Sequence, residues 1–258
     1  DVYKRQIIHS MKRKKGKKGW MAIKVDLEKA YDRLNWCFIS DTLMELRLPT
    51  SLIQLIMSCL TAGRMNILWE GELTDDISPS RGVRQGDPLS PYIFVLCIER
   101  LSHGIYESIH QNKWRPIRLA RSGPSLSHLF FADDLLLLAE ASNDQAKVIT
   151  EVLESFCLSS GAKVNKTKTQ VFFSHNVPGP TAHALSNELG FTVTSDLGKY
   201  LGMPLLHGRI TKTTYQEILD KVDQRLSGWS ASHLSLAGRI TLTQRDLQAL
   251  AIYAMQST

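Results

Sequence analysis

The stretch 131–138 reads FADDLLLL and sets two adjacent carboxylates, Asp133 and Asp134, between apolar residues. Adjacent ionised carboxylates repel each other, and apolar surroundings remove the water that would screen them. A cation is therefore expected beside these side chains. The alternative, an acidic turn exposed to solvent, is disfavoured by the four leucines that follow.

The flanking apolar runs, 129–132 and 135–138, are too short for helices and suit buried strands. They predict a hairpin with both acids at its tip. Successive strand residues point to opposite faces, so both carboxylates can approach one site only if the backbone bends between them. Of the two, Asp133 is the stronger candidate.

A third acid, Asp26, closes the strand pattern at 22–25. An aspartate at the end of a strand is by itself more often a cap or a turn former. Taken together, three aspartates from two strands suit a pair of Mg²⁺ ions, with Mn²⁺ as a substitute, because these cations prefer hard oxygen ligands and complete their shells with water and substrate phosphate. The chemistry predicted is phosphoryl transfer at a two-metal site.

No other catalytic signature competes with this one. The four cysteines are too widely spaced for a CxxC zinc site, and the sequence holds no HExxH, GxSxG or Walker P-loop. Scattered cysteines suggest reduced thiols, which fit an intracellular protein. The longest apolar run, 135–139, is far shorter than the roughly 20 residues of a membrane span, so no contact with a membrane is expected.

A glycine- and proline-containing stretch, 82–94, lies between the two acid motifs and reads GVRQGDPLSPYIF. Its start predicts a shaped loop, and Ser90 and Pro91 then fit the N-cap and first position of a long, half-buried helix. Gly86 lets the backbone approach a ligand closely, and Gln85 offers a donor and an acceptor to a base or sugar edge. Turn chemistry alone would explain the same residues as an ordinary loop before a helix.

Beyond the acidic hairpin, apolar spacing predicts an amphipathic helix with Asn143 as its N-cap and Gly161 as its C-terminal stop. A basic cluster precedes the next apolar strand and consists of Lys163, Lys166 and Lys168. This cluster could meet a triphosphate or a nucleic-acid backbone. A solvated loop would show the same spacing.

Five stretches, in this order, resemble successive palm motifs of reverse transcriptases: AIKVDLEKAYDRLNW, RQGDPLSPYIF, FADDLLLL, SGAKVNKTKT and KYLGMPL. The closest resemblance is to the LINE-type non-LTR retrotransposon family, and it runs from about Trp20 to the C-terminus. The segment LSGWSASHLSLAGRITL, which begins at Leu226, resembles the start of the plant-type thumb region of that family.

The resemblance implies an α+β fold, in which a polymerase palm with an antiparallel sheet and helices on one face is followed by a partial helical thumb. It divides the chain into a basic N-terminal segment (1–19), the palm (20–208) and the partial thumb (209–258). The elements expected are a strand at 21–26, helices at 35–47 and 50–62, a hairpin around Gly71, the long helix from Pro91, the acidic hairpin, and thumb helices at 212–227 and 235–256. Residues 174–180 are the best linker candidate within the palm, and 208–211 the expected boundary with the thumb.

The resemblance also implies roles for single residues. The three aspartates would form the metal-binding triad, and Tyr31 would be the gate that clashes with a ribose 2′-hydroxyl. Gln85 and Gly86 would line the nucleotide and template pocket. Lys168 would donate a proton to the leaving pyrophosphate or contact its phosphates. An aromatic residue such as Tyr31 near a helix start is otherwise more often part of the core.

The motif at 199–205 resembles the primer grip of the same family. Gly202 would allow a tight backbone approach to the primer end, and Tyr200 would contact the primer or template with it. Arg84, from the loop motif, is a further candidate for contact with the primer or template. Without the resemblance, 199–205 would be interpreted as a turn.

These motifs predict an RNA-directed DNA polymerase, in which a primer 3′-hydroxyl attacks the α-phosphate of a dNTP and pyrophosphate leaves. The partners expected are an RNA template, a DNA primer and dNTPs. One alternative is a truncated, catalytically inactive fragment that only binds RNA. Another is a reverse transcriptase of the group II intron type, which the thumb resemblance and the lack of a recognisable maturase segment disfavour.

Charge is concentrated at the start of the chain. The net charge is +6, yet residues 1–19 hold eight Lys or Arg and one Asp, which leaves the remainder close to neutral. The run at 12–18, KRKKGKK, could bind a phosphate backbone, act as a nuclear-localisation signal or be simply solvated. An intracellular, nuclear protein is expected. Residues 1–6 match no expected motif, and the upstream fingers and other modules of a longer polyprotein are expected to be missing.

Overall fold

The computed structural model describes residues 2–64, 66–120, 123–197, 199–200, 203–204, 216–227, 234–241 and 243–244. Two compact units make up the chain, one formed by Met11–Leu197 and the other by Asp1–Ser10 with Gly198–Thr258. Helix α1 (Val2–Lys12) spans the division between them. The second unit also contains β10 (Lys199–Tyr200), β11 (Met203–Pro204), α8 (Gln216–Ser227) and α10 (Leu236–Thr241).

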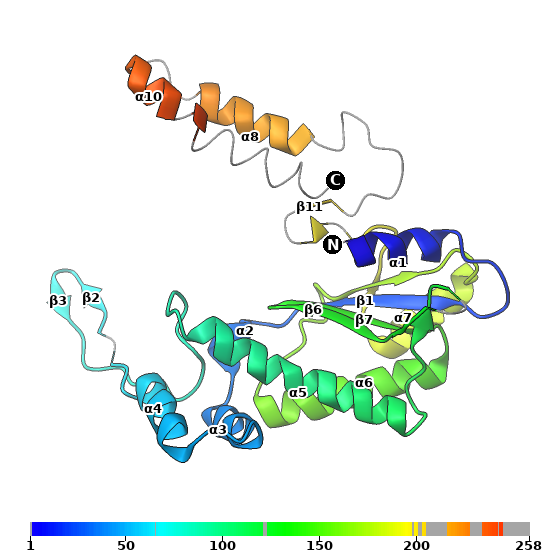
Figure 1. Cartoon of the computed structure of the whole chain (residues 1–258), viewed down its shortest axis with the longest axis horizontal. Helices are drawn as coiled ribbons and strands as arrows, with labels where there is room; N and C mark the ends of the chain where they lie inside the picture. Colours follow the sequence, from blue (N-terminus) through cyan, green and yellow to red (C-terminus); the bar gives the residue numbers. More distant parts are fainter. Residues whose placement is uncertain are drawn as a thin grey trace. The chain divides into compact units, whose positions relative to one another are not determined.

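A five-stranded sheet is the centre of the larger unit (Figure 1). Its order is β6 (His128–Phe131), β7 (Asp134–Glu140), β1 (Trp20–Val25), β8 (Gln170–Phe173) and β9 (Thr192–Val193). All neighbours are antiparallel except β8 and β9. The ladder between β1 and β7 runs from the pair Trp20–Glu140 to the pair Val25–Leu135. These two strands are interior to the sheet, which suits their continuous apolar sequences.

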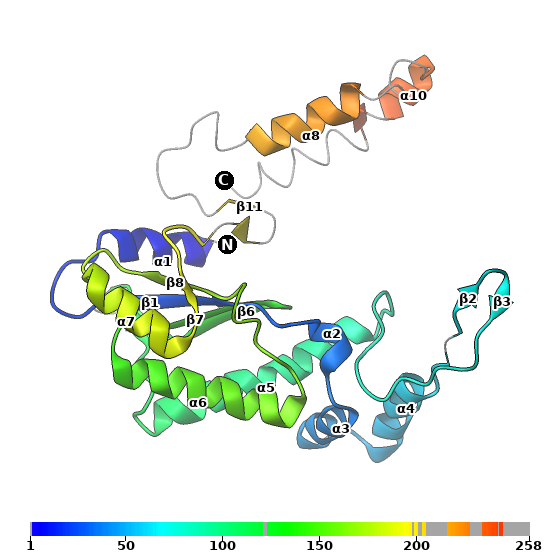
Figure 2. The same ribbon diagram turned by 180° about the vertical axis from the view of Figure 1, so that it is seen from behind.

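Helices cover one face of this sheet, and Figure 2 shows α5 (Ser90–His110) and α6 (Asn143–Ser160) lying together beneath it. Odd-numbered residues of β1 and β7, among them Ile23 and Leu137, belong to the core that these helices complete. Even-numbered residues such as Leu136 and Leu138 point to the other face and are also buried. The expected α+β palm, with an antiparallel sheet and helices on one face, is therefore observed.

The remaining elements of this unit connect or flank the sheet. They are α2 (Ala30–Arg33), α3 (Trp36–Glu45), α4 (Thr50–Thr61), β2 (Leu68–Trp69), β3 (Glu72–Leu73), β4 (Ile117–Arg118), β5 (Ser125–Leu126) and α7 (Gly179–Leu189). The strand, two helices and hairpin predicted before residue 80 are present, with shifts of one or two residues at their ends. The hairpin turns at Gly71, which has a φ of +90° that glycine tolerates without strain.

Two predicted helix caps are wrong by one residue. Helix α5 begins at Ser90 with Leu89 as its N-cap, because Asp87 already forms the preceding turn by accepting the Leu89 N–H at 2.8 Å. Helix α6 is capped by Ser142, whose backbone is extended and whose side chain accepts from the Gln145 N–H, so the predicted cap Asn143 is its first residue. The predicted stop at Gly161 is confirmed, with a φ of +75°.

Other expectations differ from the structure or lie outside it. Helix α7 is an element that the sequence did not predict, and the linker candidate 174–180 shortens to 174–178 because α7 begins at Gly179. Helix α1 occupies the segment where no element was expected. Helices α8 and α10 lie within the two predicted thumb helices, whereas 208–211 and most of 242–256 lie outside the described residues.

Candidate active site

The predicted acidic hairpin is present, but its turn lies one residue earlier than expected. Phe131 pairs with Asp134 across a two-residue turn of Ala132 and Asp133, and Ala132 takes a φ of +50°. Asp133 is exposed in the turn, while Asp134 is the partly buried first residue of β7. The backbone thus bends at Asp133, where a bend was needed to bring both carboxylates toward one site.

Asp26 lies at the same end of the sheet as the acidic turn. It follows β1 directly, and the register that pairs Val25 with Leu135 places it opposite Asp134. Its N–H donates to Thr169 Oγ1 at 3.1 Å, and its carbonyl accepts the Asn165 N–H at 2.8 Å. The backbone of Asp26 is therefore fixed by the turn that precedes β8.

Strand alternation places Lys24 and Asp134 on one face of the sheet, and the same alternation places Asp26 on that face. Lys24 Nζ lies 3.6 Å from Asp134 Oδ1, as this assignment requires. Among the described residues, no three His, Cys, Asp or Glu side chains converge into a metal-holding group. The oxygen donors suit a hard cation, but in this arrangement a lysine supplies the positive charge beside Asp134.

Tyr31, in α2, connects the acidic turn to helix α5. Its ring is stacked on Phe94 with centroids 4.6 Å apart and an interplanar angle of 10°. Burial raises the pKa of the Tyr31 phenol, and the negative charge of Asp133 raises it further. The phenol therefore lies within electrostatic range of the acidic turn.

The loop that precedes α5 is tied to α2 and the residues after it. Val83 N–H donates to Tyr31 O at 2.8 Å, and Gly82 N–H donates to Leu34 O at 2.7 Å. Gly82 has a φ of +85°, and a Cβ there would lie 2.7 Å from the carbonyl oxygen of Asp32. Only glycine fits this approach. The side chain of Asp32 also accepts from Gln85 Nε2 at 3.3 Å.

An open pocket of about 530 Å³ forms between α2 and this loop. Its lining residues are Tyr31, Gln85, Gly86, Asp87, Pro88, Ser90 and Pro91. Three of the four predicted nucleotide-binding residues, Tyr31, Gln85 and Gly86, are thus brought together, whereas Lys168 and the three aspartates do not line the pocket. Arg84 is exposed on the same loop and lies against Gly63 instead.

The remaining predicted residues lie elsewhere. Lys168 is exposed, and its N–H donates to Asn165 Oδ1 at 3.2 Å within the turn that holds Asp26. Tyr200 belongs to β10 of the second unit, and Gly202 lies outside the described residues. Lys163 of the basic cluster pairs with Glu28 at 3.0 Å.

Sequence reasoning missed the residues that position this site. Thr169 and Asn165 hold the backbone of Asp26, and Asp32 holds Gln85. The NKTKT stretch carried a usable signal, because asparagine and threonine side chains often hydrogen-bond the backbone of nearby turns. Nothing local in the sequence indicated that Phe94 supports the ring of Tyr31.

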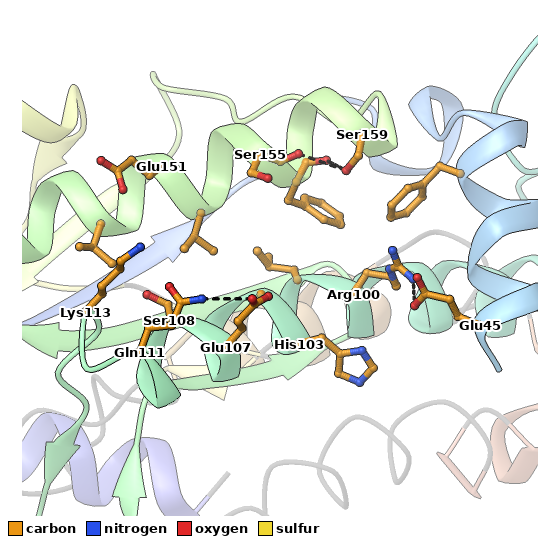
Figure 3. A pocket seen from close by; sticks show the side chains of 16 residues that line it. Glu45, Arg100, His103, Glu107, Ser108, Gln111, Lys113, Glu151, Ser155 and Ser159 are labelled. Carbon is orange, nitrogen blue, oxygen red and sulfur yellow. Dashed lines mark hydrogen bonds and ion pairs between the residues drawn. The ribbon is translucent and has the colours of Figure 1, made fainter.

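A second cavity, of about 490 Å³, lies on the helical side between α5 and α6 (Figure 3). Arg100 of α5 pairs with Glu45 of α3 at one end, and Gln111 donates to Glu107 at 3.1 Å at the other. None of the predicted site residues lines this cavity.

A largely antiparallel sheet that carries carboxylates at one end of its interior strands, with helices on a single face, is the architecture expected above for the palm of a nucleic-acid polymerase. The sequence matches the family "Reverse transcriptase (RNA-dependent DNA polymerase)" over residues 3–205. The chain therefore belongs to the reverse transcriptase family, as the motifs predicted, and its relatives include retrotransposon Pol polyproteins.

Three known proteins that are similar to this chain illustrate the comparison. An uncharacterized mitochondrial protein of Arabidopsis thaliana is 36% identical over 106 residues, which are 40% of this chain and 83% of that protein. The retrovirus-related Pol polyprotein of a type-2 retrotransposable element from Drosophila melanogaster is 28% identical over 79% of this chain. The structure of telomerase from Candida albicans, in complex with a fragment of telomeric RNA, covers 86% of this chain with a TM-score of 0.55 and 15% identity.

The chain spans 19% of the length of that Pol polyprotein and 37% of that telomerase chain. The likeness to telomerase concerns the fold alone. No helix among the described residues is long and apolar enough to cross a lipid bilayer.

Proposed function

We propose that this palm extends a DNA primer on an RNA template from dNTPs, with Mg²⁺ or Mn²⁺ as its metal. The observation that carries the proposal is the register of β1 and β7, which sets Asp26 and the acidic turn side by side at one end of the sheet. Reverse transcriptases use divalent metal ions. Carboxylates on paired strands are the donors that such ions prefer.

Asp26 and Asp133 are the proposed principal ligands, and Asp134 is the third. The ions, when bound, supply charge stabilisation at the phosphate and activation of the attacking hydroxyl. Because Lys24 pairs with Asp134, the proposal requires this lysine to move aside as the carboxylates converge. While no cation is bound, Lys24 compensates one of the three negative charges of the aspartates.

The residues of the pocket orient the incoming nucleotide. The Tyr31 ring would pack against the sugar and leave no room for a 2′-hydroxyl, while Gln85 and the backbone at Gly86 would contact the base or template. In the reaction the primer 3′-oxygen bonds to the α-phosphorus, the bond to the β-phosphate oxygen breaks, and the hydroxyl proton leaves for solvent. Pyrophosphate departs on the side where we place Lys168. Arg84, Tyr200 and Gly202 remain proposed contacts for the primer or template.

The decisive experiment is primer extension by the purified chain on an RNA template with dNTPs and Mg²⁺ or Mn²⁺. Asp133→Asn keeps the size of the turn residue and removes its charge. We expect extension to fall by about a hundredfold or more, as for the loss of one electrostatic contact to a transition state.

Asp41→Asn is the matched control, because Asp41 is an exposed carboxylate on α3 and its loss should leave the rate unchanged. Equal extension by Asp133→Asn and the unaltered chain would refute the assignment of the acids. An unaltered chain that binds primer–template and extends nothing would favour the alternative of a fragment that only binds RNA.

A further inference from the structure

A short segment of dense positive charge, residues 12–19 (the basic loop), extends from the last residue of α1 to the start of β1. It reads KRKKGKKG and carries six of the 31 Lys and Arg residues of the chain without a single acid. Because residues 20–258 are close to neutral, the long-range positive field of the protein originates largely from the first 19 residues. The reaction proposed for the palm leaves this charge without a role.

The basic loop has a fixed shape, because the connection between β8 and α7 holds it. Asn176 Nδ2 donates to Gly16 O at 2.8 Å and to Lys18 O at 3.0 Å. Ser174 Oγ in turn donates to Asn176 Oδ1 at 2.6 Å and accepts the Trp20 N–H at 2.8 Å. A buried serine and an asparagine thus fix the backbone of the cationic run.

Further contacts fix the loop at its start and in its middle. His175 N–H donates to Met11 O at 3.1 Å, just before the loop. Gly16 turns the chain with a φ of +102°. Lys14 Nζ lies 3.5 Å from the ring centroid of Trp20, a cation–π contact, and burial lowers the pKa of this lysine. Lys14 therefore contributes to the shape of the loop more than to its exposed charge.

The other cations of the loop face solvent. Lys18 is paired with Glu140 at 3.1 Å. Lys12, Arg13, Lys15 and Lys17 are exposed, and in the described part of the chain no carboxylate lies within ion-pair distance of them. Four uncompensated cations are thus displayed on a backbone that does not need to be ordered on binding, which saves the entropy that a flexible tail would lose.

The loop and the acids lie at opposite ends of strand β1. The loop enters β1 at Trp20, and the strand ends at Val25, beside Asp26. In Figure 1 the loop is the blue segment at the right of the sheet, and the β6–β7 turn lies at the other end. Six strand residues at about 3.3 Å each separate the two by roughly 20 Å, the length of about six base-pair steps of a duplex.

We propose that the basic loop is a second nucleic-acid contact, which binds the phosphate backbone of the template–primer duplex about half a helical turn from the acids. The inference rests on the proposed function of the site at the other end of β1. Recognition would be by charge alone, without base specificity. A nuclear-import receptor would instead require the run as an extended peptide, whereas Asn176 holds the same backbone in a turn.

The test is binding of a fluorescent RNA–DNA heteroduplex to the full chain in EDTA, at several salt concentrations between about 50 and 200 mM. For the double variant Lys15→Ala/Lys17→Ala we expect the slope of log K against log salt to flatten by about two units, close to 0.9 for each lost phosphate contact. The affinity at low salt should fall by about tenfold or more.

Two further variants separate charge and shape. Lys113→Ala/Lys147→Ala removes two exposed lysines near the helices and should leave affinity and slope unchanged. Asn176→Ala keeps the net charge but releases the loop, so we expect it to weaken binding severalfold, with far-UV circular dichroism unchanged.

Unchanged affinity and slope in Lys15→Ala/Lys17→Ala would overturn the proposal and favour a protein, such as an import receptor, as the partner of the basic loop. Equal losses in this variant and in the Lys113→Ala/Lys147→Ala control would also overturn it, because binding would then follow net charge alone. Since binding is measured without metal, Asp133→Asn should bind normally. If the chain does not extend primers but the loop variants still lose binding, the proposed function is refuted and the role of the basic loop in binding is supported.

Discussion

Tyr31 links three parts of the candidate site. Its ring rests on Phe94, its carbonyl accepts from Val83, and its phenol feels the charge of Asp133. These contacts tie one aromatic side chain to the long helix, the shaped loop and the acidic turn. A ring that is stacked on the core residue Phe94, on a backbone that Val83 holds, can reject a substrate sterically, because yielding would break the stacking.

Replacing this ring should relax the choice of sugar. In Tyr31→Ala we expect incorporation of rNTPs relative to dNTPs to rise by about tenfold or more, which corresponds to about 1.4 kcal/mol of lost discrimination. Steady-state incorporation of single rNTPs and dNTPs measures the ratio. Tyr31→Phe keeps the stacked ring and should keep the discrimination, whereas an unchanged ratio in Tyr31→Ala would disprove the gate.

At the residue scale, sequence reasoning succeeds where the cause is local. Short apolar runs predict the acidic hairpin, and Asp133, the stronger candidate of the two, does lie in its turn, whereas Asp134 belongs to β7 and not to the tip. Such reasoning could not predict the pairing of Lys24 with Asp134 or the bond from Asp26 to Thr169, since these partners are more than a hundred residues apart. Contacts over such separations depend on the order of strands in the sheet, which a single sequence does not reveal.

At the scale of elements, Gly161 shows how a helix end supports the site. Its φ is +75°, and a Cβ there would lie 2.8 Å from the carbonyl oxygen of Arg33, at the end of α2. The C-terminal end of α6 is thereby packed against α2, the helix that carries Tyr31. Helix α2 has only four residues, so this close packing helps to hold it in place.

Substitution of Gly161 should therefore cost stability. For Gly161→Ala we expect a loss of about 1–2 kcal/mol from the left-handed backbone, with a further penalty from the displaced carbonyl. Urea unfolding followed by circular dichroism measures it. Gly179→Ala is the control, because no atom lies within 4 Å of a Cβ at this first position of α7. Similar midpoints for the two variants would contradict the argument.

Elements with strong apolar patterns were predictable and the others were not. Helices α5 and α6 repeat large buried side chains over several turns, whereas the shorter α7 buries only Leu185 and Leu189 beside the small Ala182 and Ser186. Small and polar residues weaken the periodic signal that indicates a helix. The cap error at α6 has another cause, since Ser142 and Asn143 could each serve as the cap and only the backbone conformation decides between them. At α5 the helix begins without a side-chain cap, which no residue preference indicates.

At the scale of the whole molecule, Met11–Leu197 contains every strand of the central sheet and the helices that cover it. A chain limited to these residues should unfold as one cooperative unit. We expect coincident urea transitions by far-UV circular dichroism and by fluorescence of Trp20 and Trp114, both buried. Separate transitions for the two signals would contradict this. The division into a basic segment at 1–19, a palm at 20–208 and a thumb at 209–258, and the nuclear location, remain predictions.

The six-pair ladder between β1 and β7 makes the candidate site sensitive to parity. If either strand slipped by one residue, Asp26 would no longer lie opposite Asp134. The side chains of the slipped strand would also exchange faces, so that its core residues would leave the core. Slippage by an even number would keep the core and still separate the carboxylates. A single inserted or deleted residue within either strand would therefore separate Asp26 from the acidic turn even where the chain still folds.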